Sequence, residues 1–265
     1  MPKTPTLVIP ARYQSSRYPG KPLVKLLGTE AIVWSYRAAV KCSGGAPVYV
    51  ATDDNRIREV VEKVGGKVIM TSEGCRNGTE RVAEAAHLLG LKDDDIAINF
   101  QGDSMLTPDW FVPALMQKLL ADTGAHMSTP VIRCDNEFYK KLIDERKAGR
   151  VGGTTVVMDQ TQRAMYFSKE VVPFIGGKVD LTATPVFHHV GLYCYRVGAL
   201  KEYMKWDMGP LEKAEGLEQM RFLENGKKIA CAEVDLKGFG FWELNNPEDA
   251  PIIEAEMKKR GFKSA

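Results

Sequence analysis

The sequence predicts an α/β fold in which a mostly parallel, Rossmann-like sheet is joined by a smaller sub-domain of mixed or antiparallel strands. In the first half of the chain, short apolar runs alternate with longer amphipathic stretches. This alternation is typical of βαβ units, whose parallel sheet is covered by helices on both faces. After about residue 125 the apolar runs follow one another with little helix between them, which favours antiparallel or mixed strands.

The first half is predicted to contain four strands, each followed by a helix. The strands are short apolar runs at residues 6–10, 47–51, 67–70 and 95–100. The helices are expected at residues 31–40, 56–64, 78–89 and 108–120, where apolar residues recur at helical spacing. The second of these helices stops at Gly65-Gly66, since glycine is a common residue just past a helix end.

The second half is predicted to be richer in strands. They are expected at residues 126–133, 152–158, 163–167, 188–196 and 229–234. A helix is expected over residues 211–223, after Pro210 and before Asn225-Gly226, and a last helix over residues 247–260. The apolar surface of the 211–223 helix is expected to come from Leu211, Ala214, Leu217 and Phe222, with Glu218 and Gln219 beside it.

Composition excludes several classes of partner. The 265 residues include 36 basic and 34 acidic ones, a balance that indicates neither nucleic acid nor a membrane surface as the main partner. No basic and apolar leader is present, and no apolar run approaches the roughly 20 residues of a membrane span. The five cysteines are scattered without a CxxC pair, so we expect neither disulfides nor structural zinc, and a cytoplasmic location.

Three cations follow the first predicted strand within ten residues. Arg12, Arg17 and Lys21 lie on a loop bent by Pro19, Gly20 and Pro22. Ligands bind at the carboxyl ends of strands in open α/β sheets, and two guanidinium forks with one ammonium can surround a polyphosphate. The alternative is a solvated basic loop without a ligand.

A carboxylate also follows the fourth predicted strand, in Gln101-Gly102-Asp103. Glycine lets the backbone come close to a ligand, and an aspartate at this edge of a sheet can hold Mg²⁺. The alternative is that Asp103 caps a turn. Near the C-terminus, Asn245-Asn246 precede Pro247, so one asparagine is expected to cap the last helix while the other could face a metal.

Two further turns lead into predicted helices. Free backbone N–H groups at Asn77–Thr79 could bind a polar base or an anion, or Asn77 or Thr79 could simply cap the helix. Helix capping also explains Asp53-Asp54 without any ligand.

The adjacent histidines His188 and His189 must point to opposite faces of a strand, so they cannot share one site. His188 shares its face with Val190, Leu192 and Cys194, which is typical of a core. His189 shares a more polar face with Gly191 and Tyr193, which makes His189 and Tyr193 candidates for a substrate pocket. Glu218 and Gln219 could reach a cleft from their helix. A structural histidine and an exposed polar helix face are the simpler alternatives.

These residues occur in an ordered series of motifs. The series comprises Ile9-Pro-Ala-Arg12, Arg17-Tyr-Pro-Gly-Lys21-Pro-Leu, Ala51-Thr-Asp-Asp, Gly78-Thr-Glu-Arg81, Gln101-Gly-Asp103, Tyr166-Phe-Ser168, His189-Val-Gly-Leu-Tyr193, Leu217-Glu-Gln219 and Asn246-Pro-Glu-Asp249. In this order and over nearly the whole length, the chain resembles the CMP-Kdo synthetases, the 3-deoxy-manno-octulosonate cytidylyltransferases.

The resemblance implies a nucleotide-diphospho-sugar transferase-like fold that forms a single domain over residues 1–265. It implies a nucleotide-binding half (about 1–125), an acceptor-binding and dimerisation half (about 126–240) and a returning strand end with a C-terminal helix (241–265). The implied reaction is Mg²⁺-dependent transfer of CMP from CTP to Kdo or a close acidic sugar, with release of pyrophosphate, in lipopolysaccharide biosynthesis. A homodimer is also implied.

Carried over residue by residue, the resemblance implies four groups of site residues. Arg12, Lys21 and Asp103 would be catalytic. The nucleotide would be bound by Pro10, Ala11, Arg12, Arg17, Lys21, Asn77, Gly78, Thr79 and Gln101. The acceptor would be bound by His189, Tyr193, Glu218 and Gln219, and the metal by Asp103 and Asn245. Catalysis would rest on positioning and charge neutralisation, without a covalent nucleophile.

The chain departs from the family pattern at several positions. Asn77 replaces a serine, Ser104 a glutamate, Asn245 an aspartate and Lys169 an arginine, while Gly152-Gly-Thr-Thr155 replaces an Asn-x-Val-Lys stretch. Asn245 offers an oxygen but no charge, and Glu243 on the same strand face could compensate. Two alternatives therefore stay open: cytidylyl transfer to another small acid, such as a different ulosonic acid or a phosphonate, or a catalytically weakened nucleotide-binding homologue.

Overall fold

The computed structural model describes residues 4–14, 18–151, 153–176 and 184–263. Arg17 and Gly152, two of the positions discussed above, lie outside these residues. The chain divides into two compact units. The first unit comprises Met1–Pro113, Tyr195–Met204 and Leu236–Ala265, and the second comprises Ala114–Cys194 and Lys205–Asp235.

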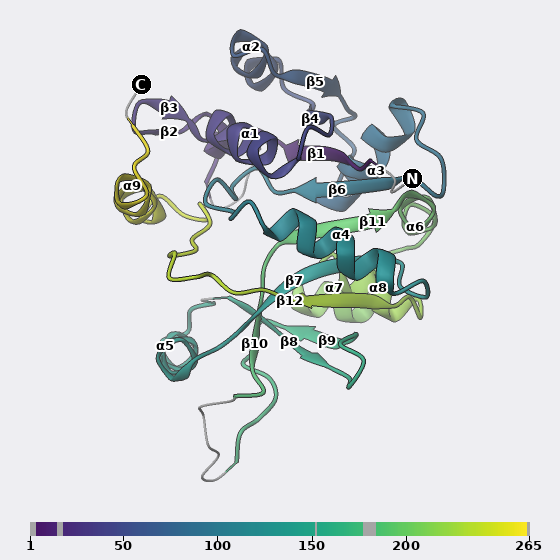
Figure 1. Cartoon of the computed structure of the whole chain (residues 1–265), viewed down its shortest axis with the longest axis vertical. Coiled ribbons are helices and arrows are strands. Elements are labelled where there is room, and N and C mark those ends of the chain that lie inside the picture. Colours follow the sequence, from purple (N-terminus) through teal and green to yellow (C-terminus); the bar gives the residue numbers. More distant parts are fainter. Residues whose placement is uncertain (1–3, 15–17, 152, 177–183, 264–265) are drawn as a thin grey trace. The chain divides into compact units, whose positions relative to one another are not determined.

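The first unit contains the predicted parallel sheet, with strands in the order β5-β4-β1-β6 (Figure 1). Its strands are β1 (Thr6–Ala11), β4 (Val48–Thr52), β5 (Lys67–Met70) and β6 (Ile96–Phe100). All three pairings among them are parallel, and every residue of β1 and β6 is buried. These central strands are mostly apolar, as expected for a parallel sheet that helices cover on both faces.

Helices of the first unit begin close to their predicted positions. They are α1 (Ala31–Cys42), α2 (Asn55–Lys63) and α3 (Gly78–Leu88), while α4 (Phe111–Ala121) runs from the first unit into the second. The predicted helix caps are confirmed at Asp54 and Asn77. Asp54 accepts a hydrogen bond from Arg56 N at 2.9 Å, and Asn77 accepts one from Glu80 N at 2.8 Å.

A short segment after β1 leads into the first helix. It holds the 3₁₀ turn η1 (Lys21–Leu23) and the two-residue strands β2 (Lys25–Leu26) and β3 (Thr29–Glu30), which pair antiparallel. Gly20, just before η1, has a φ of 73°, a left-handed conformation that favours glycine. This turn brings Lys21 back toward the carboxyl end of β6, as its ion pair with Asp103 requires.

The second unit has the predicted mixed sheet, in the order β12-β7-β10-β8-β9. Its strands are β7 (Met127–Arg133), β8 (Thr154–Met158), β9 (Ala164–Ser168), β10 (Phe187–His189) and β12 (Ile229–Glu233). β12 is parallel to β7, whereas β10 is antiparallel to both β7 and β8, and β9 is antiparallel to β8. β11 (Leu192–Arg196) crosses from the second unit to the first.

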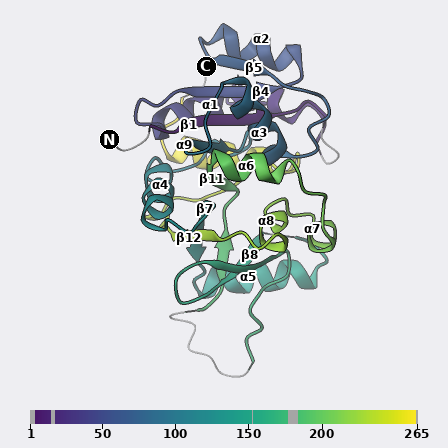
Figure 2. The same cartoon turned by 90° about the vertical axis from the view of Figure 1, so that its right-hand side faces the viewer.

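The expectation of little helix after residue 125 is wrong, because α5 (Asn136–Lys147) and α6 (Val197–Tyr203) also form (Figure 2). In α5, Leu142 alone is buried, so the apolar face is too narrow to produce a clear helical period. The stronger signal was the cap, since Asp135 accepts a hydrogen bond from Phe138 N at 2.7 Å.

The expected strand over residues 188–196 is also wrong as a single strand. β10 ends at His189 and β11 begins at Leu192. Between them Val190 N donates to Pro130 O at 3.1 Å, and Leu192 N donates to Val190 O at 2.8 Å. These bonds turn the chain, so the period-two pattern does not continue through Gly191.

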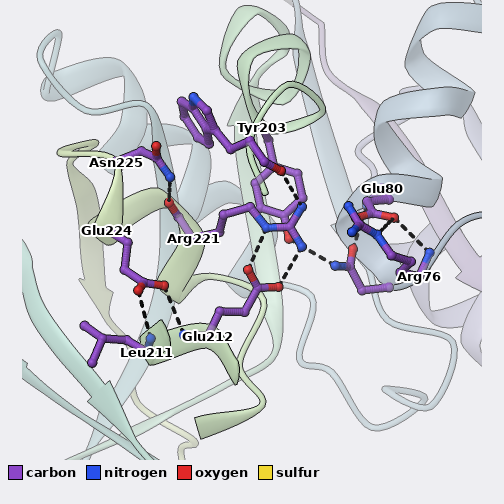
Figure 3. A network of polar contacts seen from close by, with 10 residues as sticks. Arg76, Glu80, Tyr203, Leu211, Glu212, Arg221, Glu224 and Asn225 are labelled. Carbon is purple, nitrogen blue, oxygen red and sulfur yellow. Dashed lines mark hydrogen bonds and ion pairs between the residues drawn. The ribbon is translucent and has the colours of Figure 1, made fainter. Parts of the chain in front are cut away.

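The helix expected over residues 211–223 is broken into α7 (Pro210–Glu215) and α8 (Met220–Glu224). Gly216 ends α7 in a left-handed conformation with φ of 61°. Leu211 and Ala214 are exposed, so the expected apolar face is wrong there, and the buried residue of α7 is Glu212. Glu212 is buried because Arg221 of α8 pairs with it through two nitrogens, at 2.6 and 2.7 Å (Figure 3).

The last helix, α9 (Asp249–Lys259), begins two residues later than expected, and neither Asn245 nor Asn246 caps it. Instead the Asp249 carboxylate accepts hydrogen bonds from the backbone N–H groups of both asparagines, at 2.8 and 2.6 Å. α9 packs on an apolar cluster that includes Leu26, Trp34, Leu106, Leu244, Ile253 and Met257. No helix in the described part of the chain has both the length and the apolar composition that a membrane crossing requires.

Candidate active site

A cavity of about 220 Å³ lies in the first unit, at the carboxyl ends of β1 and β6 and the start of α3. Ligands bind at this place in open α/β sheets. Eight of the residues predicted to bind nucleotide or metal line it: Pro10, Ala11, Arg12, Lys21, Asn77, Gly78, Gln101 and Asp103. The remaining lining residues are Pro22, Arg81 and Gly102. The structure therefore brings together chain segments that are up to about 90 residues apart in the sequence.

Two glycines in this wall lie close to their neighbours, and Gly102 leaves less room for a side chain than Gly78. A Cβ atom on Gly102 would lie 3.0 Å from the carbonyl oxygen of Pro10. A Cβ atom on Gly78 would lie 3.4 Å from the Pro10 ring and 3.5 Å from the Gln101 amide nitrogen. The close approach keeps β1, β6 and the start of α3 in contact, so the cavity is bordered by backbone and amide groups.

Among the predicted nucleotide-binding residues that the structure describes, Thr79 is the one that does not line the cavity. It is buried, and its hydroxyl lies 2.9 Å from the hydroxyl of Tyr195, which is also in the first unit. Asn77 does line the cavity, although its amide oxygen is engaged as the cap of α3 and its amide nitrogen donates to Tyr203 at 3.0 Å. These bonds hold the turn that presents Gly78.

Three cations line the cavity, and two of them, Lys21 and Arg12, differ in how they are paired. Lys21 forms an ion pair with Asp103 at 2.5 Å, and both side chains are four-fifths buried. Arg12 is exposed and donates a long hydrogen bond of 3.5 Å to the carbonyl of Arg76. Arg12 thus offers a guanidinium to an anion without breaking an ion pair, whereas Lys21 must exchange one negative partner for another.

Arg81 is a wall residue whose position the sequence analysis did not predict. Its side chain is almost fully buried and donates to Asp53 at 2.8 Å and to Thr71 at 2.6 Å. Asp53 is therefore the partner of Arg81, while its neighbour Asp54 caps α2. The arginine of the Gly78-Thr-Glu-Arg81 motif could have been singled out, because a charged residue inside an otherwise buried helix needs a specific partner.

A second cavity of about 480 Å³ adjoins the first and shares Arg12 and Arg81 with it. Its other lining residues are Tyr13, Gln14, Asp53, Asp54, Arg56, Glu73 and Cys75. The Arg56 guanidinium lies 3.4 Å over the Tyr13 ring and pairs with Asp54 at 2.6 Å. Because Arg56 and Arg81 already have carboxylate partners, Arg12 is the cation best placed to serve either cavity.

The predicted metal ligands come from two segments that are adjacent in the first unit. Leu244 N donates to Asp103 O at 3.4 Å, so the backbone places Glu243 and Asn245 next to the Asp103 segment. The Asn245 amide nitrogen donates to Glu243 at 3.5 Å. No cluster of three or more His, Cys, Asp or Glu side chains suited to a metal occurs among the described residues. Two carboxylates and an amide are nevertheless compatible with Mg²⁺, which usually takes one or two protein carboxylates and keeps several waters.

The predicted acceptor-binding residues lie in the second unit, and three of them form a connected group. The His189 ring is 5.6 Å from the Tyr193 ring, and the Tyr193 hydroxyl donates to the Gln219 amide oxygen at 3.2 Å. The Gln219 side chain is buried, and its amide nitrogen has no hydrogen-bond partner within the described residues. Glu218 is half-buried on the same turn before α8. An unpaired amide is costly in a protein interior and suits a site that receives a polar ligand.

The two histidines point in opposite directions, as the parity argument predicted. His188 packs edge-on against Phe138 of α5, while His189 packs against Phe167 of β9. His189 and Tyr193, expected on the more polar face of the strand, are both buried. Burial lowers the pKa of His189 from 6.5 to about 3, and that of His188 to about 4.

The neutral His189 ring has a defined tautomer. The Thr129 hydroxyl lies 2.9 Å from the carbonyl oxygen of Leu192 and 3.0 Å from His189 Nε2. A carbonyl can only accept, so the hydroxyl donates to Leu192 and the Nε2–H group of His189 donates to the hydroxyl. The remaining ring nitrogen, Nδ1, is then a hydrogen-bond acceptor.

Comparison with known proteins decides the family. The family model described as "Cytidylyltransferase" matches residues 6–229. A 3-deoxy-manno-octulosonate cytidylyltransferase of Maricaulis maris is 42% identical over 254 residues, which cover 96% of this chain and 97% of the relative. The chain belongs to the cytidylyltransferase family.

Further similarities agree with this cytidylyltransferase assignment. An 8-amino-3,8-dideoxy-manno-octulosonate cytidylyltransferase of Shewanella pealeana is 40% identical, with 95% of this chain and 98% of the relative covered. The structure of a CMP:2-keto-3-deoxy-manno-octonic acid synthetase complexed with CTP aligns with a TM-score of 0.82 at 32% identity, covering 97% of this chain and 99% of that one. The resemblance and the fold class expected from the sequence are therefore confirmed.

Two motifs of this cytidylyltransferase have structural roles that the sequence analysis did not predict. In the Tyr166-Phe-Ser168 motif, the Tyr166 and Ser168 hydroxyls donate to Glu215 at 3.2 and 2.7 Å, and Lys169 N donates to it at 2.9 Å. The Glu215 carboxylate thereby joins β9 to the end of α7. Along the chain, the Leu217-Glu-Gln219 turn follows Glu215, which is bonded to β9. It precedes Arg221, which is held in the buried pair with Glu212.

Proposed function

We propose that this cytidylyltransferase transfers CMP from CTP to an acidic sugar of the Kdo type, with Mg²⁺, and releases pyrophosphate. The observation that carries the proposal is the cavity at the carboxyl ends of β1 and β6, with Arg12 open to an anion and Lys21 paired to Asp103. The intact charges also argue against a weakened, merely nucleotide-binding homologue. The sugar class is supported by the relatives named for 3-deoxy-manno-octulosonate and its 8-amino form.

In this reaction an acceptor hydroxyl oxygen forms a bond to the α-phosphorus of CTP, while the bond from that phosphorus to the pyrophosphate oxygen breaks. The hydroxyl proton is lost to solvent. Negative charge grows on the leaving pyrophosphate, so fixed cations beside it lower the barrier. Arg12 and Lys21 supply that charge. The narrow wall at Gly78 and Gly102 orients the nucleotide, and orientation alone can contribute several kcal/mol, on the order of 7, to such a reaction.

Magnesium, when bound, would neutralise phosphate charge and hold phosphate oxygens in a reactive arrangement. Asp103 is the carboxylate we assign to it, with Asn245 and Glu243 as oxygen donors from the adjacent segment. The Lys21–Asp103 pair suits this exchange. With CTP and Mg²⁺ bound, Lys21 would pair with the phosphates and the Asp103 carboxylate would hold the cation.

We assign acceptor binding to the Gln219 amide nitrogen, which donates, and to the neutral His189 ring, whose Nδ1 atom accepts. A donor and an acceptor suit a polyhydroxylated acid. Lys169, which follows β9, is half-buried and adds a positive charge near the same turn. Its Nζ atom lies beside Gly216, 2.9 Å from the position that a Cβ atom would take there. Homodimerisation stays a prediction. It is tested by measuring the molar mass of the protein in solution by light scattering.

The experiment is a pyrophosphate-release assay with CTP and Mg²⁺ across a panel of Kdo, its 8-amino analogue, another ulosonic acid and a small phosphonate. We expect turnover with Kdo or the 8-amino analogue. Turnover restricted to the phosphonate or to another ulosonic acid would replace the proposed acceptor but keep the chemistry. Tight CTP binding without turnover on any acceptor would overturn the proposal in favour of a nucleotide-binding protein.

A further inference from the structure

The two segments that carry the proposed metal ligands are joined by one arginine of the C-terminal helix. Arg260 follows α9, and its Nη1 atom donates to Leu106 O at 2.8 Å, three residues after Asp103. Its Nη2 atom donates to Gly240 O, three residues before Glu243. The same planar group thus holds a carbonyl from each segment, which a lysine cannot do with comparable geometry.

The Arg260 guanidinium is itself held in place. Glu256, one turn earlier in α9, accepts from Arg260 Nε at 2.9 Å and from Gly240 N at 3.0 Å. A Cβ atom on Gly240 would lie 3.0 Å from the Glu256 carboxyl group, so glycine leaves room for this close approach. Burial opposes the charge on Glu256, but the bonds from Arg260 and Gly240 outweigh it and lower the pKa of Glu256.

Apolar packing supports the same two segments. Leu106 and Leu244 belong to one buried cluster with Ile253 and Met257 of α9, and Trp242 packs against that cluster. The Phe239 ring lies 4.8 Å from the Arg260 guanidinium carbon. The segment that returns to the site is therefore fixed to α9 by side chains on both sides of Glu243.

We propose that Arg260 is a positioning residue for the metal site. It sets the separation between the Asp103 segment and the Glu243–Asn245 segment, without touching metal or substrate. Residues behind metal ligands often decide affinity because they fix where the ligands stand. This inference rests on the proposed function, since it requires a cation at Asp103.

The test measures binding of Mn²⁺ in the presence of CTP, by the electron paramagnetic resonance signal of free Mn²⁺, for wild type, Arg260→Met and Arg260→Lys. We expect Arg260→Met to weaken Mn²⁺ binding by about 10-fold or more, the usual range for a residue behind the ligands. Arg260→Lys should give a smaller loss, because an ammonium reaches one carbonyl at a time. The CTP KM at saturating metal should stay close to that of wild type.

Arg163→Met is the matched control. Like Arg260, Arg163 is a partly buried arginine. In the second unit it pairs with the Asp122 carboxylate through two nitrogens, and it has no role in the proposed site. It should leave Mn²⁺ binding unchanged. If Arg260→Met does not fold, Glu256→Gln replaces it, because losing the carboxylate removes the orientation of Arg260 and should weaken Mn²⁺ binding several-fold.

Two results separate this inference from the proposed function. Provided that Asp103→Ala abolishes Mn²⁺ binding, a Mn²⁺ affinity of folded Arg260→Met within about twofold of wild type would overturn the positioning role. If Arg260→Met does not fold, the same criterion applies to Glu256→Gln. Unchanged Mn²⁺ binding in Asp103→Ala would instead overturn the assignment of the metal to Asp103, and with it this inference, whereas CMP transfer is tested separately by the pyrophosphate-release assay.

Discussion

Replacing Arg221 by methionine should destabilise the second unit more than any surface change. Arg221 is fully buried and Glu212 is 4% exposed, and they meet through two bonds of 2.6 and 2.7 Å. Arg221→Met leaves the Glu212 carboxylate buried without its cation, which typically costs about 3–5 kcal/mol. An attraction of about 4 kcal/mol between unit charges roughly 4 Å apart, at an effective dielectric constant of 20, gives the same order.

Structure supplies the control and a second readout. Arg58 and Glu62 form an i,i+4 pair on α2 with both side chains nearly half exposed, so Arg58→Met should cost at most about 0.5 kcal/mol. Arg221→Met with Glu212→Leu should recover much of the loss, since a buried pair can be replaced by apolar residues. Because Gln219 is two residues from Arg221, we also expect a higher acceptor KM.

Urea unfolding followed by tryptophan fluorescence measures the free energy. Trp206 lies in the second unit, where its ring is 5.9 Å from that of Phe222 and its carbonyl accepts from Arg221 at 3.5 Å. A loss under about 1 kcal/mol for Arg221→Met, or one no larger than for Arg58→Met, would refute the reasoning, because it would mean that the Glu212 carboxylate is not held by its charge partner.

Three further predictions concern the site. Asp103→Ala should lower turnover by about 10³-fold or more with the circular dichroism spectrum unchanged, and near-wild-type activity would remove Asp103 from the mechanism. Arg12→Met should raise the CTP KM by about tenfold, the worth of one charge-assisted hydrogen bond, and leave the acceptor KM unchanged; equal rises in both would contradict a phosphate role. His189→Ala should raise the acceptor KM more than the CTP KM. Because the pKa of His189 in the folded protein is about 3 against 6.5 in the unfolded chain, the stability it contributes is full above pH 6.5 and declines as the pH falls toward 3. Unfolding at pH 5 and 7.5 checks this, and a wild-type stability difference that is unchanged in His189→Gln would count against it.

The parallel half of the fold could be predicted from the sequence because its signals are local. Strands β1, β4, β5 and β6 are short apolar runs, and Asp54 and Asn77 mark helix starts through bonds to residues two or three positions away. The second half was harder. Gly216 interrupts an apparently continuous helix, and Glu212 is buried by a partner nine residues away, so apolar periodicity misplaces that face.

The candidate site divides in the same way. Arg12, Lys21, Gln101 and Asp103 could be named in advance because each follows a strand that ends at the edge where ligands bind. The partners of Arg81 and Gly102 could not, because they are Asp53 and the backbone of Pro10, which are distant in the sequence.

By itself, the sequence determined the fold class, the family motifs and the cations of the loop after β1, because these depend on residues close together in the chain. Only the tertiary structure decided which groups have partners. It pairs Lys21 with Asp103, leaves Arg12 exposed, buries His189 in its neutral form and connects Arg260 to the carbonyls of Leu106 and Gly240. Charge state and pairing depend on burial and on groups distant in sequence, and these are set when the chain packs.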